Sequence, residues 1–185
     1  TGGLLLFTLM TTMAFRAIGV AVLGVGAITA STSLTPDMIL EPSGRAALVR
    51  NADGRLVFLG QSRPVFALQQ WLPGDRDARQ PRDPALATDV RCDKSGCTFE
   101  RANGDIVAVV ANHDAFAEDC ERATLIVTPL VAPEACWTKA EIYDKAFFAA
   151  YGATYIYRTP KGPILETARN PRLNRPWLTS DASES

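Results

Sequence analysis

The stretch MILEPSGRAALVRNADGRLVFL, residues 38–59, decides the fold expected for this chain. It contains apolar runs at 38–41, 45–50 and 55–59, each of a length typical of a β-strand. Clusters of turn-forming residues separate these runs, and an Asp-Gly pair next to a strand is a strong hairpin signal. The clusters are Pro42-Ser43-Gly44 and Asn51-Ala52-Asp53-Gly54. The stretch therefore predicts consecutive strands joined by tight turns.

Further strands and short helices are predicted on the C-terminal side of this stretch. A helix with Pro in its first turn is expected over 64–72, and a polar, Pro-rich loop over 73–88. Helices are also expected from Asn112 to about Cys120 and over 145–151. The remaining strands are predicted around 97–100 and Ile142, and at 105–111, 124–128, 153–158 and 163–167. This mixture predicts an α+β, layered and β-rich domain over residues 35–185.

The first 36 residues differ in composition from the rest of the chain. Arg16 is their only charged residue, whereas the whole chain has 19 basic and 20 acidic residues and a net charge of −1. Residues 17–36 match the roughly 20 residues that a bilayer core requires. We therefore expect residues 1–34 to be the C-terminal transmembrane segment or segments of a larger membrane protein, with a turn near Arg16. A cleaved signal peptide and a buried core helix are the alternatives.

Arg16 also gives a weak signal for orientation. If it marks the cytoplasmic side of the inner membrane, the domain after residue 36 faces the periplasm. The even number of cysteines agrees with such a compartment, because disulfides persist where the environment is oxidising.

The four cysteines, Cys92, Cys97, Cys120 and Cys136, allow three pairings. We favour Cys92–Cys97, which closes a short Gly-containing loop, together with Cys120–Cys136, which flanks the apolar run at 124–130. A four-cysteine zinc site is an alternative, but the second pair is too widely spaced for the usual zinc clip. Four free, buried thiols are the other alternative.

Several motifs occur in an order that resembles one known family. They are SGRAALVRNADGRLVFL at 43–59, Gln69-Gln70-Trp71, Cys92-Asp-Lys-Ser-Gly-Cys97, GDIVAVV at 104–110, Glu118-Asp119-Cys120, Cys136 and Arg175-Pro176-Trp177. The ordered set, which covers essentially the whole chain, resembles the C-terminal region of ComEC-family competence proteins. More narrowly, it is similar to the branch whose C-terminal domain is a degenerate metallo-β-lactamase-like fold.

The resemblance implies a function in natural transformation. ComEC-family proteins are inner-membrane channels that pass single-stranded DNA into the cytoplasm. The implied partners are therefore single-stranded DNA, the membrane, other DNA-uptake proteins and further copies of the chain in a homo-oligomer. A metal-dependent nuclease acting on incoming DNA and an unrelated, exported, disulfide-bonded binding domain are the rival functions.

Catalytic and metal-binding residues are not expected. Family members with an intact lactamase-like domain carry two His-rich metal clusters, whereas His113 is the single histidine here. Neither 60–72 nor 131–137 contains a histidine where those clusters would be expected. We therefore predict no catalytic residue, no metal and no cofactor. Two alternatives remain: His113-Asp114 as half of a ligand set or a general base, and Asp93, Glu118 and Asp119 as ligands of a hard cation. Helix capping and solvated turns explain these residues more simply.

One window of the sequence is clearly basic. It contains Arg158, Lys161, Arg169, Arg172 and Arg175 against the single acid Glu166. Tyr155, Tyr157 and Trp177 lie beside it, and cations with aromatic rings can bind a single strand by phosphate contact and base stacking. A solvated strand edge and tail is the alternative. The small net charge of the whole chain argues against general attraction of nucleic acid over the entire surface.

Overall fold

The structure is a computed structural model in which residues 13–31 and 35–170 are described; for residues 14, 15 and 28–31 the description covers the backbone alone. The chain divides into two compact units, Thr1–Thr35 and Pro36–Ser185. The first unit contains helix α2, Met13–Ser31. Arg16 lies within α2, so the turn predicted near this residue is absent from the described backbone.

The expectation of a transmembrane segment before the domain is wrong. Among the described residues, no helix is both long and apolar enough to cross a membrane. The predicted placement in the inner membrane depended on this segment and is contradicted by the same finding.

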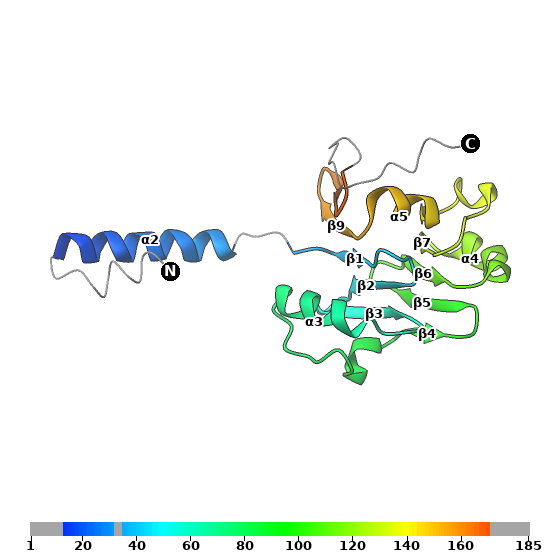
Figure 1. The fold of residues 1–185 in the computed structure, drawn as a ribbon, viewed down its shortest axis with the longest axis horizontal. Helices are drawn as coiled ribbons and strands as arrows, with labels where there is room; N and C mark the ends of the chain where they lie inside the picture. Colours follow the sequence, from blue (N-terminus) through cyan, green and yellow to red (C-terminus); the bar gives the residue numbers. More distant parts are fainter. Residues whose placement is uncertain (1–12, 32–34, 171–185) are drawn as a thin grey trace. The chain divides into compact units, whose positions relative to one another are not determined.

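The second unit is an α+β domain built on two five-stranded sheets (Figure 1). All neighbouring strands of the first sheet are antiparallel. In spatial order they are β10 (Gly162–Thr167), β9 (Thr154–Thr159), β1 (Met38–Leu40), β2 (Ala46–Arg50) and β3 (Leu56–Gly60). The strands predicted from residues 38–59 are thus adjacent in this sheet, and Leu48 lies opposite Phe58 in the register.

The second sheet is mixed. Its order is β4 (Arg91–Cys92), β5 (Gly96–Glu100), β6 (Ile106–Val110), β7 (Leu125–Val127) and β8 (Glu141–Tyr143). β4, β5 and β6 are antiparallel, whereas β6, β7 and β8 run parallel. A parallel pair needs a crossover connection. The crossovers are η2 (His113–Ala115) with α4 (Phe116–Arg122), and η3 (Glu134–Cys136).

Apolar side chains fill three layers of core. Successive side chains of a strand point to opposite faces of its sheet, and in this domain apolar side chains are buried on both faces of each sheet. Met38 and Val107 belong to the core that the sheets share, whereas Ile39 and Ala108 belong to the outer cores. α3 (Val65–Gly74) and η1 (Pro84–Ala87) cover the outer face of the first sheet, and α4 and η3 cover that of the second. α5 (Lys145–Tyr151) contributes Phe148 to the shared core.

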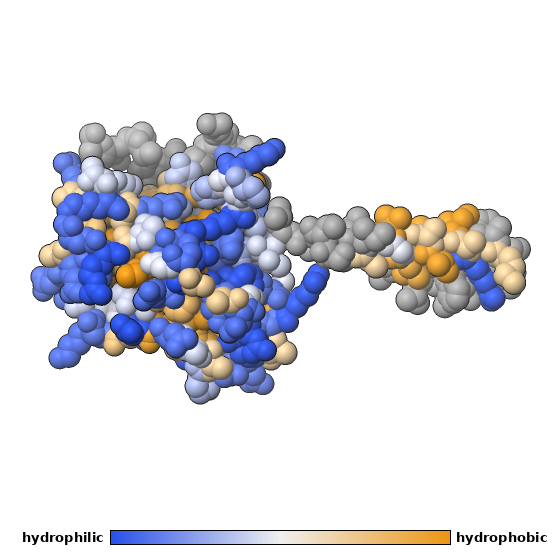
Figure 2. Space-filling model, turned by 180° about the vertical axis from the view of Figure 1, so that it is seen from behind, coloured by the Kyte–Doolittle hydropathy of each residue, from blue (hydrophilic) through white to orange (hydrophobic). Residues whose placement is uncertain are grey.

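One face of the domain is mainly polar. Figure 2 shows hydrophilic side chains over most of it, with small, separate apolar areas between them. The large apolar side chains that are exposed in the described part of the domain include two neighbours on β10; they are Phe66, Val131, Trp137, Ile164 and Leu165. Isolated apolar side chains are normal on a protein surface.

Candidate functional site

The carboxyl ends of the parallel strands β6, β7 and β8 form the first place where a site could lie. In open α/β sheets, ligands usually bind outside these ends. Here Asn112 and His113 follow β6, Thr128 follows β7 and Asp144 follows β8. The sequence pointed to His113 as a candidate site residue, but not to Thr128 or Asp144. A polar residue directly after a buried strand was the available signal for Thr128 and Asp144.

Hydrogen bonds within the fold occupy the polar groups at this edge. Asp144 is buried, and its Oδ1 accepts the backbone N–H groups of Ala146 and Phe147, at 3.0 Å each, as the N-cap of α5. Its Oδ2 accepts the N–H of Ala132 at 3.4 Å. Thr128 is also buried, and its Oγ1 accepts the N–H of Leu130 at 3.2 Å. These side chains therefore hold backbone in place.

Close packing also closes this edge. Gly44, in the turn between β1 and β2, lies so near Thr128 that a Cβ on the glycine would be 2.5 Å from the threonine carbonyl oxygen. His113 is exposed, and its ring centroid lies 5.8 Å from that of Phe116. The Asn112 side chain accepts the N–H of Asp114 at 3.3 Å, which is a capping geometry. This arrangement favours helix capping as the explanation of the Asn112-His113-Asp114 motif.

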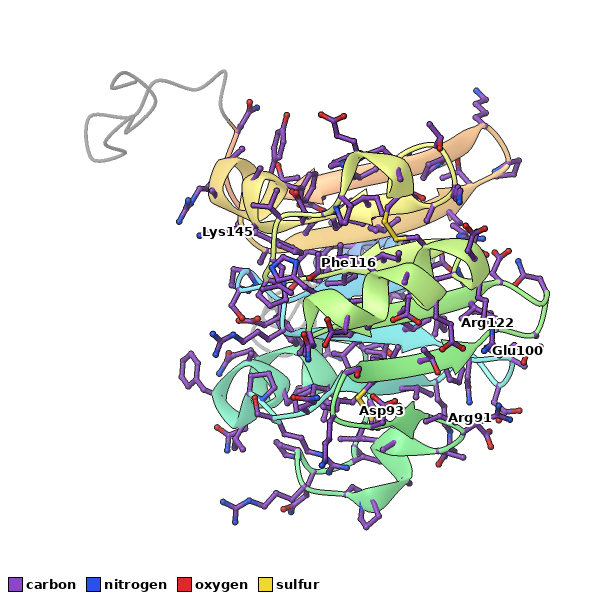
Figure 3. The ribbon with its side chains drawn as sticks, turned by 90° about the vertical axis from the view of Figure 1, so that its right-hand side faces the viewer. Arg91, Asp93, Glu100, Phe116, Arg122 and Lys145 are labelled. Carbon is purple, nitrogen blue, oxygen red and sulfur yellow. A yellow bond between two sulfur atoms is a disulfide. The ribbon has the colours of Figure 1, made fainter. Side chains whose placement is uncertain are left out.

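Two hollows form the second place where a site could lie, with volumes of about 580 and 290 Å³. Both are lined by Arg91, Asp93, Thr98, Glu118 and Asp119. Figure 3 shows the larger hollow's Arg91, Asp93, Glu100 and Arg122, which come from β4 with its following turn, β5 and α4. The carboxylates that the sequence suggested as cation ligands therefore do lie along common hollows.

The three carboxylates nevertheless have different surroundings. Asp93 accepts the N–H groups of Ser95 and Gly96, at 2.7 and 3.0 Å. Glu118 forms an ion pair of 2.5 Å with Arg122. Burial raises the pKa of Asp119, and the charges of Glu118 and Asp93 raise it further. Among the described residues, no group of three or more histidine, cysteine or acidic side chains is arranged to hold a metal ion.

The basic window does not form one surface within the described residues. Arg158 Nη1 donates to Asp105 at 3.1 Å, and Arg169 Nη1 donates to the carbonyl oxygen of Ala149 at 2.8 Å. Lys161 lies in the exposed turn between β9 and β10. Arg172, Arg175 and Trp177 lie outside the described residues.

The tyrosines beside the window also separate from Arg158. Tyr155 and Tyr157 lie two residues apart on β9, so they share one face, and Tyr155 belongs to the outer core with Trp71. Arg158 shares the opposite face with Ile156, which is buried in the core between the sheets. The Tyr157 hydroxyl donates to Glu166 at 3.1 Å. The strand thus divides the aromatic rings from the guanidinium group.

A charged group that sequence reasoning missed links the two sheets. Asp37 Oδ2 accepts the N–H of Arg158 at 2.6 Å, and its Oδ1 lies 3.8 Å from Arg101 Nη2. Asp105 joins the group through its bond to Arg158, and hydrogen bonds from Asn103 and Arg158 lower its pKa. Burial lowers the pKa of Arg101, whose Nη1 is buried without a hydrogen-bond partner in the described structure. Asp37 and Arg158 lie far from Arg101 and Asp105 in the sequence, so no local pattern could reveal the contact between the sheets.

The cysteines pair as the sequence analysis favoured. Cys92–Cys97 joins β4 to β5, and Cys120–Cys136 joins α4 to η3. Cys92 is exposed, whereas the relative exposures of Cys97, Cys120 and Cys136 are 1, 6 and 2%. The described chain contains no free cysteine.

No family model, curated protein or solved structure matches this chain. The two sheets are therefore not assigned to the metallo-β-lactamase fold, and the resemblance to ComEC-family proteins stays a prediction.

Proposed function

We propose that this chain takes part in the uptake of single-stranded DNA during natural transformation. We further propose that the unit Pro36–Ser185 is a non-catalytic domain that braces or guides the DNA-handling machinery. Single-stranded DNA is proposed as the partner because the ordered set of motifs resembles ComEC-family proteins. The observation that carries the non-catalytic role is the closed edge at the ends of β6, β7 and β8.

Hydrolysis of a phosphodiester needs groups that activate water and stabilise the developing charge. At this edge, the carboxylate of Asp144 is the N-cap of α5 and also accepts the N–H of Ala132. The hydroxyl oxygen of Thr128 accepts a backbone N–H, and Gly44 packs against the same residue. Each group therefore has a role in folding that competes with a role in chemistry.

The surface supports at most a modest electrostatic contribution to DNA binding. Lys161 projects from the turn between β9 and β10, and the Arg158 side chain remains 40% exposed while paired with Asp105. Isolated cations attract phosphate groups without reading sequence. We therefore expect weak, sequence-independent contact with a single strand.

Two assays on matched strains and proteins test this function. Deleting the gene should reduce uptake of labelled DNA, whereas His113→Ala should leave uptake unchanged because His113 is an exposed residue at a helix start. The purified full chain should leave an end-labelled single strand intact with Mg²⁺, Mn²⁺ or Zn²⁺. Asp144→Asn serves as a folding control, because both carboxylate oxygens of Asp144 accept backbone N–H groups and an amide has only one acceptor oxygen.

The outcomes separate the two parts of the proposal. Unchanged uptake after deletion of the gene would overturn the role in DNA uptake. Metal-dependent cleavage that His113→Ala abolishes, without a change in melting temperature, would overturn the non-catalytic role and favour the nuclease.

A further inference from the structure

The two disulfides differ in their access to solvent. Cys120 and Cys136 lie in the outer core between the second sheet, α4 and η3, and both are almost fully buried. In the other bond, Cys92 is exposed and lines the smaller hollow, while Cys97 is 1% exposed in the core between the sheets. Of the four cysteines, Cys92 is therefore the residue that a reagent in solution can approach in the folded domain.

β4, which carries Cys92, lies at the edge of the second sheet. β4 has two residues, both exposed, and among the described strands it pairs with β5 alone. The turn after it is held independently of the disulfide: Asp93 N–H donates to the carbonyl oxygen of Gly96 at 2.9 Å, and the Asp93 side chain accepts two further N–H groups. Opening the bond can thus leave the backbone of this turn in place while β5 keeps Cys97 in the core.

We propose that Cys92–Cys97 is a thiol–disulfide exchange site that reacts with a dithiol, whereas Cys120–Cys136 is a permanent structural bond. This inference does not depend on the proposed role in DNA uptake. It rests on the contrast in burial between the bonds and on the hollow that reaches Cys92, because access decides which sulfur a thiolate attacks.

The exchange proceeds in two balanced steps. A thiolate of the dithiol attacks Cys92 Sγ, a mixed disulfide forms, and Cys97 leaves as a thiolate that takes up a proton. The second thiolate of the dithiol then attacks the dithiol sulfur that is bonded to Cys92 Sγ. This closes the disulfide of the reagent and expels Cys92 as a thiolate, which is also protonated. The dithiol loses two electrons and becomes a disulfide, and the protein gains two thiols.

Differential labelling of the native chain tests the contrast between the bonds. The protein is incubated with increasing dithiothreitol, alkylated and digested, and the labelled cysteines are identified by mass spectrometry. Cys92 and Cys97 should become labelled at a dithiol concentration at least roughly tenfold below that needed for Cys120 and Cys136. Simultaneous opening of both bonds, or earlier opening of Cys120–Cys136, would overturn the proposal.

Two variants, each lacking one cysteine of the Cys92–Cys97 bond, test which sulfur is attacked. In Cys97→Ala the remaining Cys92 thiol should react rapidly with an aromatic disulfide reagent, whereas in the matched Cys92→Ala the Cys97 thiol should react only after denaturation. Equal reaction of the two thiols in folded proteins would overturn attack at Cys92. If either variant fails to fold, the labelling of the native chain still decides the contrast between the bonds, since it needs no substitution.

Discussion

Gly44 shows how one residue determines how closely the two sheets approach. It has a φ of +72°, a conformation that costs other residues roughly 1–2 kcal/mol. Its missing Cβ also leaves room for the carbonyl group of Thr128 and the ring of Phe148, which would lie 2.5 and 2.9 Å from a Cβ. Both the backbone conformation and the close packing at this position therefore require a glycine.

Gly44→Ala should lower the free energy of unfolding by about 2–4 kcal/mol, because conformational strain and overpacking add. The matched control is Gly54→Ala. Gly54 has a φ of +74° but no neighbour within 4 Å of a Cβ, so its substitution should cost only the roughly 1–2 kcal/mol of strain. Urea unfolding of both variants measures the difference, and equal costs would contradict the close approach.

Asp119 is a residue whose environment opposes its charge. Its pKa is raised by burial and by Glu118 and Asp93, so the ionised form is less favourable in the folded than in the unfolded chain. The penalty is present above the folded pKa and disappears as the pH falls through it towards the unfolded value of about 3.9. Asp119→Asn should therefore stabilise the fold by roughly 0.5 kcal/mol at neutral pH and have little effect below about pH 4.

Thermal unfolding of Asp119→Asn at several pH values measures this effect. Glu134→Gln, which removes one charge from an exposed position in η3, is the control for net charge. A stabilisation that persists unchanged in acid would show that the charge of Asp119 is not its cause.

At the scale of elements, the Cys120–Cys136 bond joins the two crossovers on either side of β7. It links α4, which leads into β7, to η3, which leads out of it towards β8. The bond spans 16 positions of the chain, whereas Cys92–Cys97 spans 5. In the chain-entropy model the longer loop gives the larger stabilisation.

Replacing Cys120 and Cys136 by Ala should therefore cost roughly 3 kcal/mol, and replacing Cys92 and Cys97 by Ala roughly 2 kcal/mol. Chemical unfolding of the two double variants, with the other disulfide intact in each, provides the comparison. A larger loss from the Cys92/Cys97 variant would mean that β4 contributes more to folding than its two exposed residues indicate.

The sequence predicted elements where their pattern is local. Apolar runs and turn signals locate β2 and β3 close to their observed bounds, and the helix predicted over 145–151 coincides with α5. β4 was not predicted as a strand, because two exposed residues have no periodicity. The membrane segment was predicted wrongly because composition was read over 17–36, whereas the helix starts before Arg16 and ends at Ser31.

The candidate site could be predicted only in part, for the same reason. The cysteine pairs and the helix cap at Asn112 could be predicted, because the residues involved lie close together in the sequence. The contacts among Asp37, Arg101, Asp105 and Arg158 depend on the meeting of two sheets, so charge counts alone assigned Arg158 to a basic surface. Alternation along β9 then placed the tyrosines on the other face.

At the scale of the molecule, any DNA binding depends on dispersed cations. Replacing Lys161 and Arg169 by Gln should weaken binding of a single strand equally for all sequences. The dependence of affinity on salt should become shallower by about 0.7 for each phosphate that the variant no longer neutralises. Arg158 is left unchanged because its pair with Asp105 joins the sheets.

Fluorescence anisotropy with a labelled single strand at several salt concentrations measures both quantities. Arg45→Gln combined with Arg82→Gln removes the same charge from exposed positions outside the basic window. If this control changes the salt slope as much as the test pair does, the window has no special role in binding.

The position of β1 between β2 and β9 has a consequence for how the chain reaches its native state. Met38 pairs with Val49 on one side and with Ile156 on the other, so the middle of the first sheet joins segments from opposite ends of the domain. During synthesis, the β1–β2–β3 meander can form early, but its open flank must wait until β9 leaves the ribosome. Closing such a long loop lowers the entropy of the chain before the pairing of β1 with β9 can stabilise the sheet. We therefore expect slow, late completion of this sheet, with a nascent intermediate whose exposed β1 edge is a natural point of chaperone capture.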